Sequence, residues 1–205
     1  MHFYEAVVLP RLCDWAMKNH RFAPYRQRVL AAARGRVLEI GMGSGLNLPF
    51  YTGRVASIGG LEPAPALIAR TRRRLAARPD VSVSLIQGTA ESIPLQDASV
   101  DTVVTTWTLC SIPDVGRALA EMHRVLKPHG QLLFVEHGLA PQRRVRKWQN
   151  RLTPMWSRIS GGCHLNRPIG DLIERSGFTL DHLDTGYMRG PKPATFMYEG
   201  RALPR

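Results

Sequence analysis

The chain has 205 residues, of which 44% are hydrophobic, so it can bury one sizeable core, and wholesale disorder is not expected. Its formal charge of +12 predicts attraction to anions, whether lipid headgroups, nucleic acid or an acidic substrate. Cys13, Cys110 and Cys163 lie too far apart for a disulfide framework, and no apolar run reaches the ~18 residues that span a bilayer. The first residues lack the basic region of a signal peptide, so we expect one domain over residues 1–205 in the cytoplasm.

Residues 1–33 precede the first strand and are expected to form a helical lid or cap. Apolar side chains between positions 3 and 16 fall near one helical face, which Pro10 interrupts, and a second helix is expected from about 25 to 33. Such a segment can pack on the domain, close over a cofactor or touch a membrane surface, and the pattern leaves all three open.

A glycine-rich turn follows the first buried strand. That strand ends near the acid Glu39, Gly41, Gly43 and Gly45 then alternate, and a helix is expected to start within residues 46–51. The spacing is neither the G-x-G-x-x-G of nicotinamide-binding turns nor a P-loop, which needs a Lys-Ser/Thr pair. An acid beside such a turn suits a ligand with a cationic amino group and a ribose. S-adenosylmethionine (SAM) meets that description better than a pyrophosphate, and a purely structural turn is the alternative.

A second acid ends the next predicted strand. The apolar run 55–61 leads into Glu62, about 20 residues beyond the glycines, where an acid is placed to accept hydrogen bonds from ribose hydroxyls. Pro63 and Pro65 then begin a helix that is expected to reach about residue 78. Two linked features in one strand–helix–strand unit favour a nucleotide-binding fold more than either does alone.

The remaining elements continue this alternation. We expect strands at 81–87, 99–107 and 131–136, a helix at 114–126, and two final strands at 178–183 and 194–201. Alternating strands and helices predict the α/β class, here a doubly wound, Rossmann-like, seven-stranded sheet with helices on both faces and the last strand antiparallel. Right-handed crossovers place a cofactor at the carboxyl ends of its strands.

Over residues 36–137 the chain resembles class I SAM-dependent methyltransferases, in their type 11 branch. The segments that carry the resemblance are 38–45, Glu62, 88–91 with 93–94, 99–101 and the Arg-Val-Leu-Lys-Pro-His-Gly run at 124–130. The resemblance implies an enzyme with SAM as cofactor and S-adenosylhomocysteine as its product. One departure is Thr89, which stands where the family often has an Asp, so the adenine amino group must be bound by Glu91, main chain or water.

The resemblance also implies which residues bind the cofactor. They are Glu39, Gly41, Met42, Gly43 and Gly45 at the methionine moiety, Glu62 with the adjacent Pro63 at the ribose, Ala90 and Glu91 beside the adenine, and Thr106 and Trp107 at the sulfonium.

A closer resemblance is to a subgroup near the vertebrate thiol methyltransferases, carried by residues 108–111, 134–137 and 162–167. The N-terminal anchor of those membrane enzymes is not expected in this chain. Bacterial phospholipid N-methyltransferases and quinone-pathway C-methyltransferases share much of the same core. We therefore expect methyl transfer to a small lipophilic nucleophile, with a thiol favoured. The alternatives are phosphatidylethanolamine N-methylation, quinone-type C-methylation and a SAM-binding protein without activity.

His137 and Glu136 are the candidate catalytic residues, because they follow the fifth strand near the expected sulfonium. His137 would deprotonate or steer a thiol or hydroxyl, and Glu136 would orient it or a loop. A histidine bonded only to neighbouring backbone is the alternative.

The segment 138–177 interrupts the strand–helix rhythm and is expected to supply the acceptor side. Its candidate pocket residues are Cys163, His164, Asn166 and Arg167, and capping of the next helix is the alternative role for the last two. Cys163 and His164 with His137 do not predict a metal site, because adjacent residues rarely both coordinate one ion and a fourth ligand is not evident.

The basic run 143–151, with Trp148 among its cations, is typical of a solvated helix face. It also fits a helix at an anionic membrane surface, which would place the protein at the inner face of the membrane. A nucleic-acid partner is not expected, because no aromatic platform or known RNA-binding motif accompanies the charge. Nothing in the pattern indicates an oligomeric state.

Overall fold

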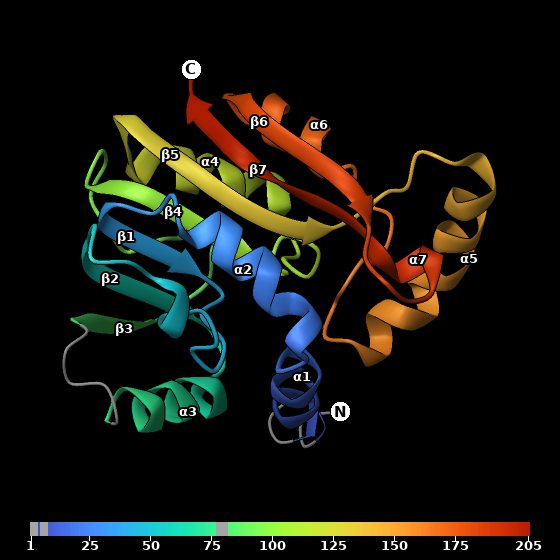
Figure 1. Cartoon of the computed structure of the whole chain (residues 1–205), viewed down its shortest axis with the longest axis horizontal. Coiled ribbons are helices and arrows are strands. Elements are labelled where there is room, and N and C mark those ends of the chain that lie inside the picture. Colours follow the sequence, from blue (N-terminus) through green and yellow to red (C-terminus); the bar gives the residue numbers. More distant parts are fainter. Residues whose placement is uncertain (1–3, 5–7, 77–81) are drawn as a thin grey trace.

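The computed structural model describes Tyr4 and residues 8–76 and 82–205. Its centre is a seven-stranded sheet with the order β3-β2-β1-β4-β5-β7-β6 (Figure 1). The strands are β1 (Gly35–Ile40), β2 (Val55–Glu62), β3 (Val83–Gln87), β4 (Val100–Thr106), β5 (Leu126–His137), β6 (Phe178–Tyr187) and β7 (Phe196–Pro204). The first five run parallel, whereas β7 pairs antiparallel with both β5 and β6. The predicted fold class, with its antiparallel edge, is confirmed.

Helices cover both faces of the sheet because the buried strands are apolar on both sides. On β5, Leu132 and Phe134 pack in one core cluster with residues of α4 (Val115–Val125) and α6 (Ile169–Arg175). Leu133 and Val135 point the other way, into a cluster with α2 (Ala23–Leu30). Successive strand residues face opposite sides, so a continuous apolar run demands a cover on each. Figure 1 shows α2 in front of the strands and α4 and α6 behind them.

Helix α3 (Pro65–Leu75) packs along β2 and β3. The remaining helices are α1 (Leu9–Met17), α5 (Arg143–Ile159) and the short α7 (Lys192–Thr195), with short 3-10 helices at His20–Phe22 and Leu48–Phe50. In Figure 1, α1 and α5 lie on the side to which β1 and β5 point. No helix among the described residues is long and apolar enough to cross a membrane.

One sequence prediction differs from the structure, and others fall on residues that it does not describe. Helix α1 begins at Leu9, so Pro10 sits in its first turn, where a missing N–H costs nothing, and most of the helical face expected upstream of it lies outside the described residues. The helix expected within 46–51 is only the 3-10 turn at Leu48–Phe50, because Tyr51 is extended and turns its hydroxyl back to Glu39. The expected end of the helix after Glu62, near residue 78, lies outside the described residues. So does the expected start of the third strand, at residue 81.

Candidate functional site

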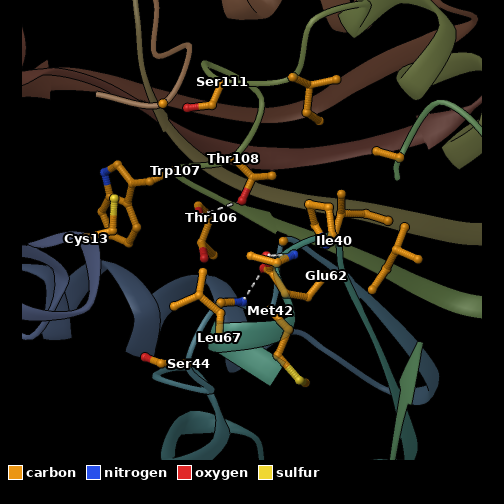
Figure 2. A pocket seen from close by; sticks show the side chains of 18 of the residues that line it. Cys13, Ile40, Met42, Ser44, Glu62, Leu67, Thr106, Trp107, Thr108 and Ser111 are labelled. Atoms are coloured by element: carbon orange, nitrogen blue, oxygen red, sulfur yellow. Dashed lines mark hydrogen bonds between the residues drawn. The ribbon is translucent and has the colours of Figure 1, made fainter. Parts of the chain in front are cut away.

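A cavity of about 550 Å³ lies at the carboxyl ends of the parallel strands, where the order of a doubly wound sheet reverses. Of the eleven residues that sequence analysis assigned to a cofactor, the cavity is lined by Glu39, Gly41, Met42, Gly43, Glu62, Pro63, Ala90, Glu91, Thr106 and Trp107. Gly45 is not among the lining residues. Figure 2 shows the residues that follow β4 above this cavity and those of the glycine-rich turn below it.

In the turn after β1, backbone atoms without side chains line the cavity. Gly41 and Gly43 have φ of +67° and +60°, a left-handed conformation that side chains other than glycine disfavour. A Cβ on Gly41 would also lie 2.5 Å from the Thr108 side chain. A Cβ on Gly43 would meet no atom nearer than 3.8 Å, so its conformation, and not crowding, requires glycine there.

Glu62 fixes this turn to the end of β2. Its carboxylate accepts hydrogen bonds from the backbone N–H of Gly43 at 2.8 Å and of Ala64 at 2.9 Å. The side chain is buried, which raises the pKa of the carboxyl group, and the two N–H donors only partly oppose this shift. Each carboxylate oxygen has a further lone pair, so Glu62 keeps acceptor capacity toward the cavity.

Glu39 lies in a buried polar network that the glycine motif alone does not indicate. Asn47 Nδ2 donates to one carboxylate oxygen at 2.9 Å, and the Tyr51 hydroxyl donates to the other at 2.7 Å. Arg26 from α2 donates in turn to Asn47 Oδ1 at 3.0 Å. Burial raises the pKa of Glu39 to about 7, although these donors and the Arg26 charge act against it. Glu39 therefore gains or loses its proton near neutral pH.

Trp107 forms a wall of the cavity in a strained conformation. Its φ is +51°, which costs a bulky residue energy and is found where the surroundings enforce it. Its ring packs edge-on against Phe22 at 4.8 Å, and the Arg26 guanidinium lies 5.0 Å from the ring centroid. Within the described chain the buried indole N–H of Trp107 has no hydrogen-bond partner. An unpartnered buried donor on a cavity wall is available to a ligand.

Helix α1 closes the cavity on one side through Leu9, Pro10, Cys13, Asp14 and Met17. Asp14 is only 5% exposed and accepts hydrogen bonds from Ser44 of the glycine-rich turn and from Arg70 Nη1 of α3, the latter at 2.5 Å. Lys18 Nζ lies 2.8 Å from the same carboxylate. Burial disfavours the charged form of Asp14, but Lys18, Ser44 and Arg74, whose Nη2 lies 3.2 Å from Asp14 Oδ1, outweigh it and lower the pKa of Asp14 to about 2. The ion-paired Asp14 thus ties α1 to the turn and to α3.

The two candidate catalytic residues do not line the cavity. Glu136 is fully buried, and its Oε1 accepts hydrogen bonds from Thr105 Oγ1 at 2.5 Å and from the N–H groups of Thr108 and Leu109 at 2.9 and 3.1 Å. Glu136 therefore contacts the loop after β4, and not His137, through that oxygen. The His137 Nε2 lies 3.0 Å from the Cys163 sulfur.

The four candidate acceptor-pocket residues lie behind the cavity wall. His164 Nδ1 is 2.6 Å from the Gly162 carbonyl oxygen. Asn166 donates to Asn150 of α5 at 2.9 Å, and Arg167 donates to the carbonyl oxygens of Leu109 and Ile112. Arg167 thus contacts the segment after β4, and none of the four residues lines the cavity, whereas Ser160 and Gly161 do.

Sequence reasoning missed three polar residues of the site: Asp14, Arg26 and Asn47. The sequence offers one signal for Asp14, because it is an acid within an otherwise apolar helical segment. Arg26 and Asn47 belong to no motif, and only the fold brings them to Glu39.

The lining residues fit SAM. The bare backbone at Gly43 admits close approach of a ligand, and the two buried acids offer acceptors for an ammonium group and a sugar. Arg26, from α2, provides a cation on the same wall for a carboxylate. The volume lies within the range of about 300–1,000 Å³ that is usual for small-molecule and cofactor sites.

Known proteins share this arrangement. The family model described as a methyltransferase domain matches residues 38–134. Thiol S-methyltransferase TMT1B from Homo sapiens is 30% identical over 186 residues, which are 89% of this chain and 74% of that protein. The protein of the same name from Rattus norvegicus is 35% identical over 151 residues, 72% of this chain, and there the alignment spans only 62% of the relative's length.

A bacterial relative and a solved structure complete the comparison. Phosphatidylethanolamine N-methyltransferase from Cereibacter sphaeroides is 34% identical over 131 residues, 60% of this chain and 64% of that protein. The crystal structure of a SAM-dependent methyltransferase from Thermotoga maritima aligns over 100% of this chain and 99% of that one, with a TM-score of 0.70 and 22% identity. This last likeness concerns the fold.

Proposed function

The chain belongs to the class I SAM-dependent methyltransferases, and on this premise we propose that it transfers the methyl group of SAM to the sulfur of a small lipophilic thiol. The observation that carries the acceptor class is the likeness to thiol S-methyltransferases, which extends over 89% of the chain and well beyond the cofactor motifs. Leu9, Pro10 and Met17 on the α1 side of the cavity are apolar, which suits a lipophilic acceptor.

The residues of this chain have positioning roles in such a reaction. SAM, when bound, supplies a methyl group that is already activated on a cationic sulfur, so alignment and exclusion of water dominate the task. We assign the holding of the cofactor to Glu39, Glu62 and the backbone of the glycine-rich turn. We assign the exclusion of water to Trp107 and to α1. A free thiol is a few per cent thiolate at neutral pH, so it needs little help in losing its proton to solvent.

The experiment that tests the acceptor class uses the full chain and SAM with a deuterated methyl group. Alkanethiols of increasing length are compared with the matching alcohols and amines and with a quinol, and mass spectrometry records which compound gains the labelled methyl. We expect methylated thiols and no methylated alcohols. Methylation confined to amines or quinols would overturn the thiol assignment. A Glu62→Gln variant, assayed in parallel, controls for transfer that does not depend on the cavity.

We also propose that α1 and α5 contact an anionic membrane surface. Six large hydrophobic side chains on these two helices are exposed: Leu12, Trp15, Trp148, Met155, Trp156 and Ile159. The start of α1 lies beside the end of α5, because Leu9 approaches Gly161, two residues past α5, and the Tyr4 hydroxyl donates to the Ile159 carbonyl oxygen at 2.6 Å. α5 carries Arg and Lys residues and no acid, and exposed tryptophans among cations favour a headgroup region.

Vesicle flotation tests this surface. We expect the full chain to float with phosphatidylglycerol-containing vesicles and to stay behind with purely zwitterionic ones. A Trp15→Ala, Trp148→Ala double variant should lose most of the binding, whereas Leu203→Ala, an exposed apolar side chain on β7, should not. Equal recovery with both vesicle types would contradict the proposal.

Phosphatidylethanolamine is the second candidate acceptor, favoured by the Cereibacter sphaeroides relative and by the same cationic surface. Vesicles that contain phosphatidylethanolamine, incubated with the chain and labelled SAM, would then yield a methylated headgroup. If the headgroup stays unmethylated while thiols are methylated, this candidate is excluded.

A further inference from the structure

Three side chains with nitrogen or sulfur donors meet behind the cavity wall, although they come from distant parts of the chain. Cys110 follows β4, His137 is the last residue of β5, and Cys163 lies between α5 and α6. The two sulfurs and a ring nitrogen of His137 all lie within 4.8 Å of one another. Cys110 and His137 are buried, and Cys163 is partly buried. Sequence reasoning had grouped His164 with His137 and Cys163, but in the structure the third member is Cys110.

We propose that Cys110, His137 and Cys163 bind a Zn²⁺ ion. Thiolate and imidazole are the donors that zinc prefers, and two cysteines with one histidine form an established three-ligand set. Zinc–sulfur bonds of about 2.3 Å and zinc–nitrogen bonds of about 2.0 Å place tetrahedral donors roughly 3.5–3.8 Å apart. The three donors lie within 4.8 Å of one another, so side-chain shifts of about 1 Å or less bring them to this spacing.

The charge balance of this cluster suits a divalent ion. Two thiolates cancel the charge of Zn²⁺, so the buried centre carries no net charge, and burial without net charge avoids the large cost of an isolated ion. Arg167 is the nearby cation, and it donates to the Leu109 and Ile112 carbonyl oxygens on the segment after β4. Glu136 is next to His137 in the chain, and its Oε2 has no partner among the described residues.

The ion would join the segments that form two cavity walls. Cys110 lies between Trp107 and Ser111, which both line the cavity, and Cys163 follows Gly161, which also lines it. These segments already contact each other through the hydrogen bond from His164 N–H to the Cys110 carbonyl oxygen at 2.8 Å and through those from Arg167 to the Leu109 and Ile112 carbonyl oxygens. Zinc would fasten both segments to the end of β5. Three protein donors leave the fourth tetrahedral position to water or another small donor.

Metal content of the full chain tests the site without any methyl acceptor. The chain is purified from zinc-supplemented culture under reducing conditions and passed over a chelating resin, and zinc is measured by elemental analysis. We expect about one zinc per chain in the wild type and in Cys13→Ser, whose thiol lies outside the cluster. We expect Cys110→Ser, His137→Gln and Cys163→Ser to bind zinc at least tenfold more weakly in competition with a chromogenic chelator.

Cobalt substitution provides a second readout that distinguishes loss of ligands from loss of fold. Co²⁺ bound by the wild type should show thiolate-to-cobalt charge-transfer absorption, and Cys163→Ser should show about half of it while its circular dichroism stays unchanged. Three results would each overturn the proposal: no stoichiometric zinc in the wild type, equal zinc in all variants, or a Cys110–Cys163 disulfide in place of the ion. None of them bears on the thiol acceptor, so the two proposals fail separately.

Discussion

The Glu62 carboxylate accepts a hydrogen bond of 2.8 Å from the backbone N–H of Gly43, so the end of β2 and the glycine-rich turn after β1 form one rigid corner. The second carboxylate oxygen accepts from Ala64 N–H at the start of α3. One side chain thus organises three segments around the position that we assign to the ribose.

Glu62→Gln should weaken SAM binding by about 10- to 100-fold, the loss expected when one or two hydrogen bonds to a charged group are removed. The amide nitrogen of glutamine would face an N–H donor at Gly43 or Ala64, so the corner loses its shape as well as its charge. Titration calorimetry with SAM measures the effect. Asp181→Asn, which removes a surface partner of Arg201 on the β6–β7 edge, is the matched control and should bind normally. Unchanged affinity of Glu62→Gln would remove Glu62 from the cofactor site.

Glu39 should make the free protein less stable as pH rises toward neutrality. Its folded-state pKa is raised to about 7, so between the unfolded value near 4.5 and pH 7 only the unfolded chain releases this proton. The free energy of unfolding therefore falls by about 3 kcal/mol as pH rises from about 4.5 to 7. Above pH 7, Glu39 causes no further change. Urea unfolding at pH 5, 6, 7 and 8 should give a smaller difference across this range in Glu39→Gln than in the wild type. Identical pH profiles would show that Glu39 is ionised in the free protein.

The same proton links pH to cofactor affinity. If the SAM ammonium group lies beside Glu39, binding favours the carboxylate, and affinity should rise about tenfold per pH unit up to pH 7 and then level off. Calorimetry in buffers of different ionisation enthalpy would detect the released proton at pH 6. A pH-independent affinity would place the ammonium group elsewhere.

Asp14→Asn should loosen α1. The substitution removes the buried charge that Lys18, Arg70 and Arg74 share, so these three cations lose their partner. The Ser44 hydroxyl also loses a charged acceptor. We expect amide hydrogen exchange in α1 to accelerate at least tenfold and the KM for SAM to rise. Asp181→Asn again serves as control. If amide hydrogens of α1 exchange in Asp14→Asn at the wild-type rate, the apolar contacts of α1 hold the helix in place without the ion pairs.

Glu136 is expected to position the loop after β4 and to take no part in proton transfer. Glu136→Gln keeps an acceptor oxygen for Thr105, Thr108 and Leu109, so its kcat and the pH dependence of kcat should remain close to wild type. Glu136→Ala leaves these donors unsatisfied, at a cost of about 1–3 kcal/mol for each that stays buried, so it should lower both the melting temperature and kcat. A pH profile altered by Glu136→Gln would instead make this residue a proton carrier.

The sequence determined the fold more fully than the site, for identifiable reasons. Apolar runs and the Gly41–Gly43 spacing suffice for the strand–turn unit, and the acids Glu39 and Glu62 are fixed by their places at strand ends. The 3-10 turn at Leu48–Phe50 could not be foreseen, because it depends on the tertiary bond from Tyr51 to Glu39. Likewise, whether Cys163 approaches Cys110 or the cavity depends on the course of a loop that has no periodic pattern.

The most direct test of a SAM cofactor held at this corner is titration of the full chain with S-adenosylhomocysteine by calorimetry. The predicted result is saturable binding of one molecule per chain, strongly weakened in Glu62→Gln and unaffected in Asp181→Asn. Absence of binding to the wild type, or equal binding to Glu62→Gln, would contradict the assignment.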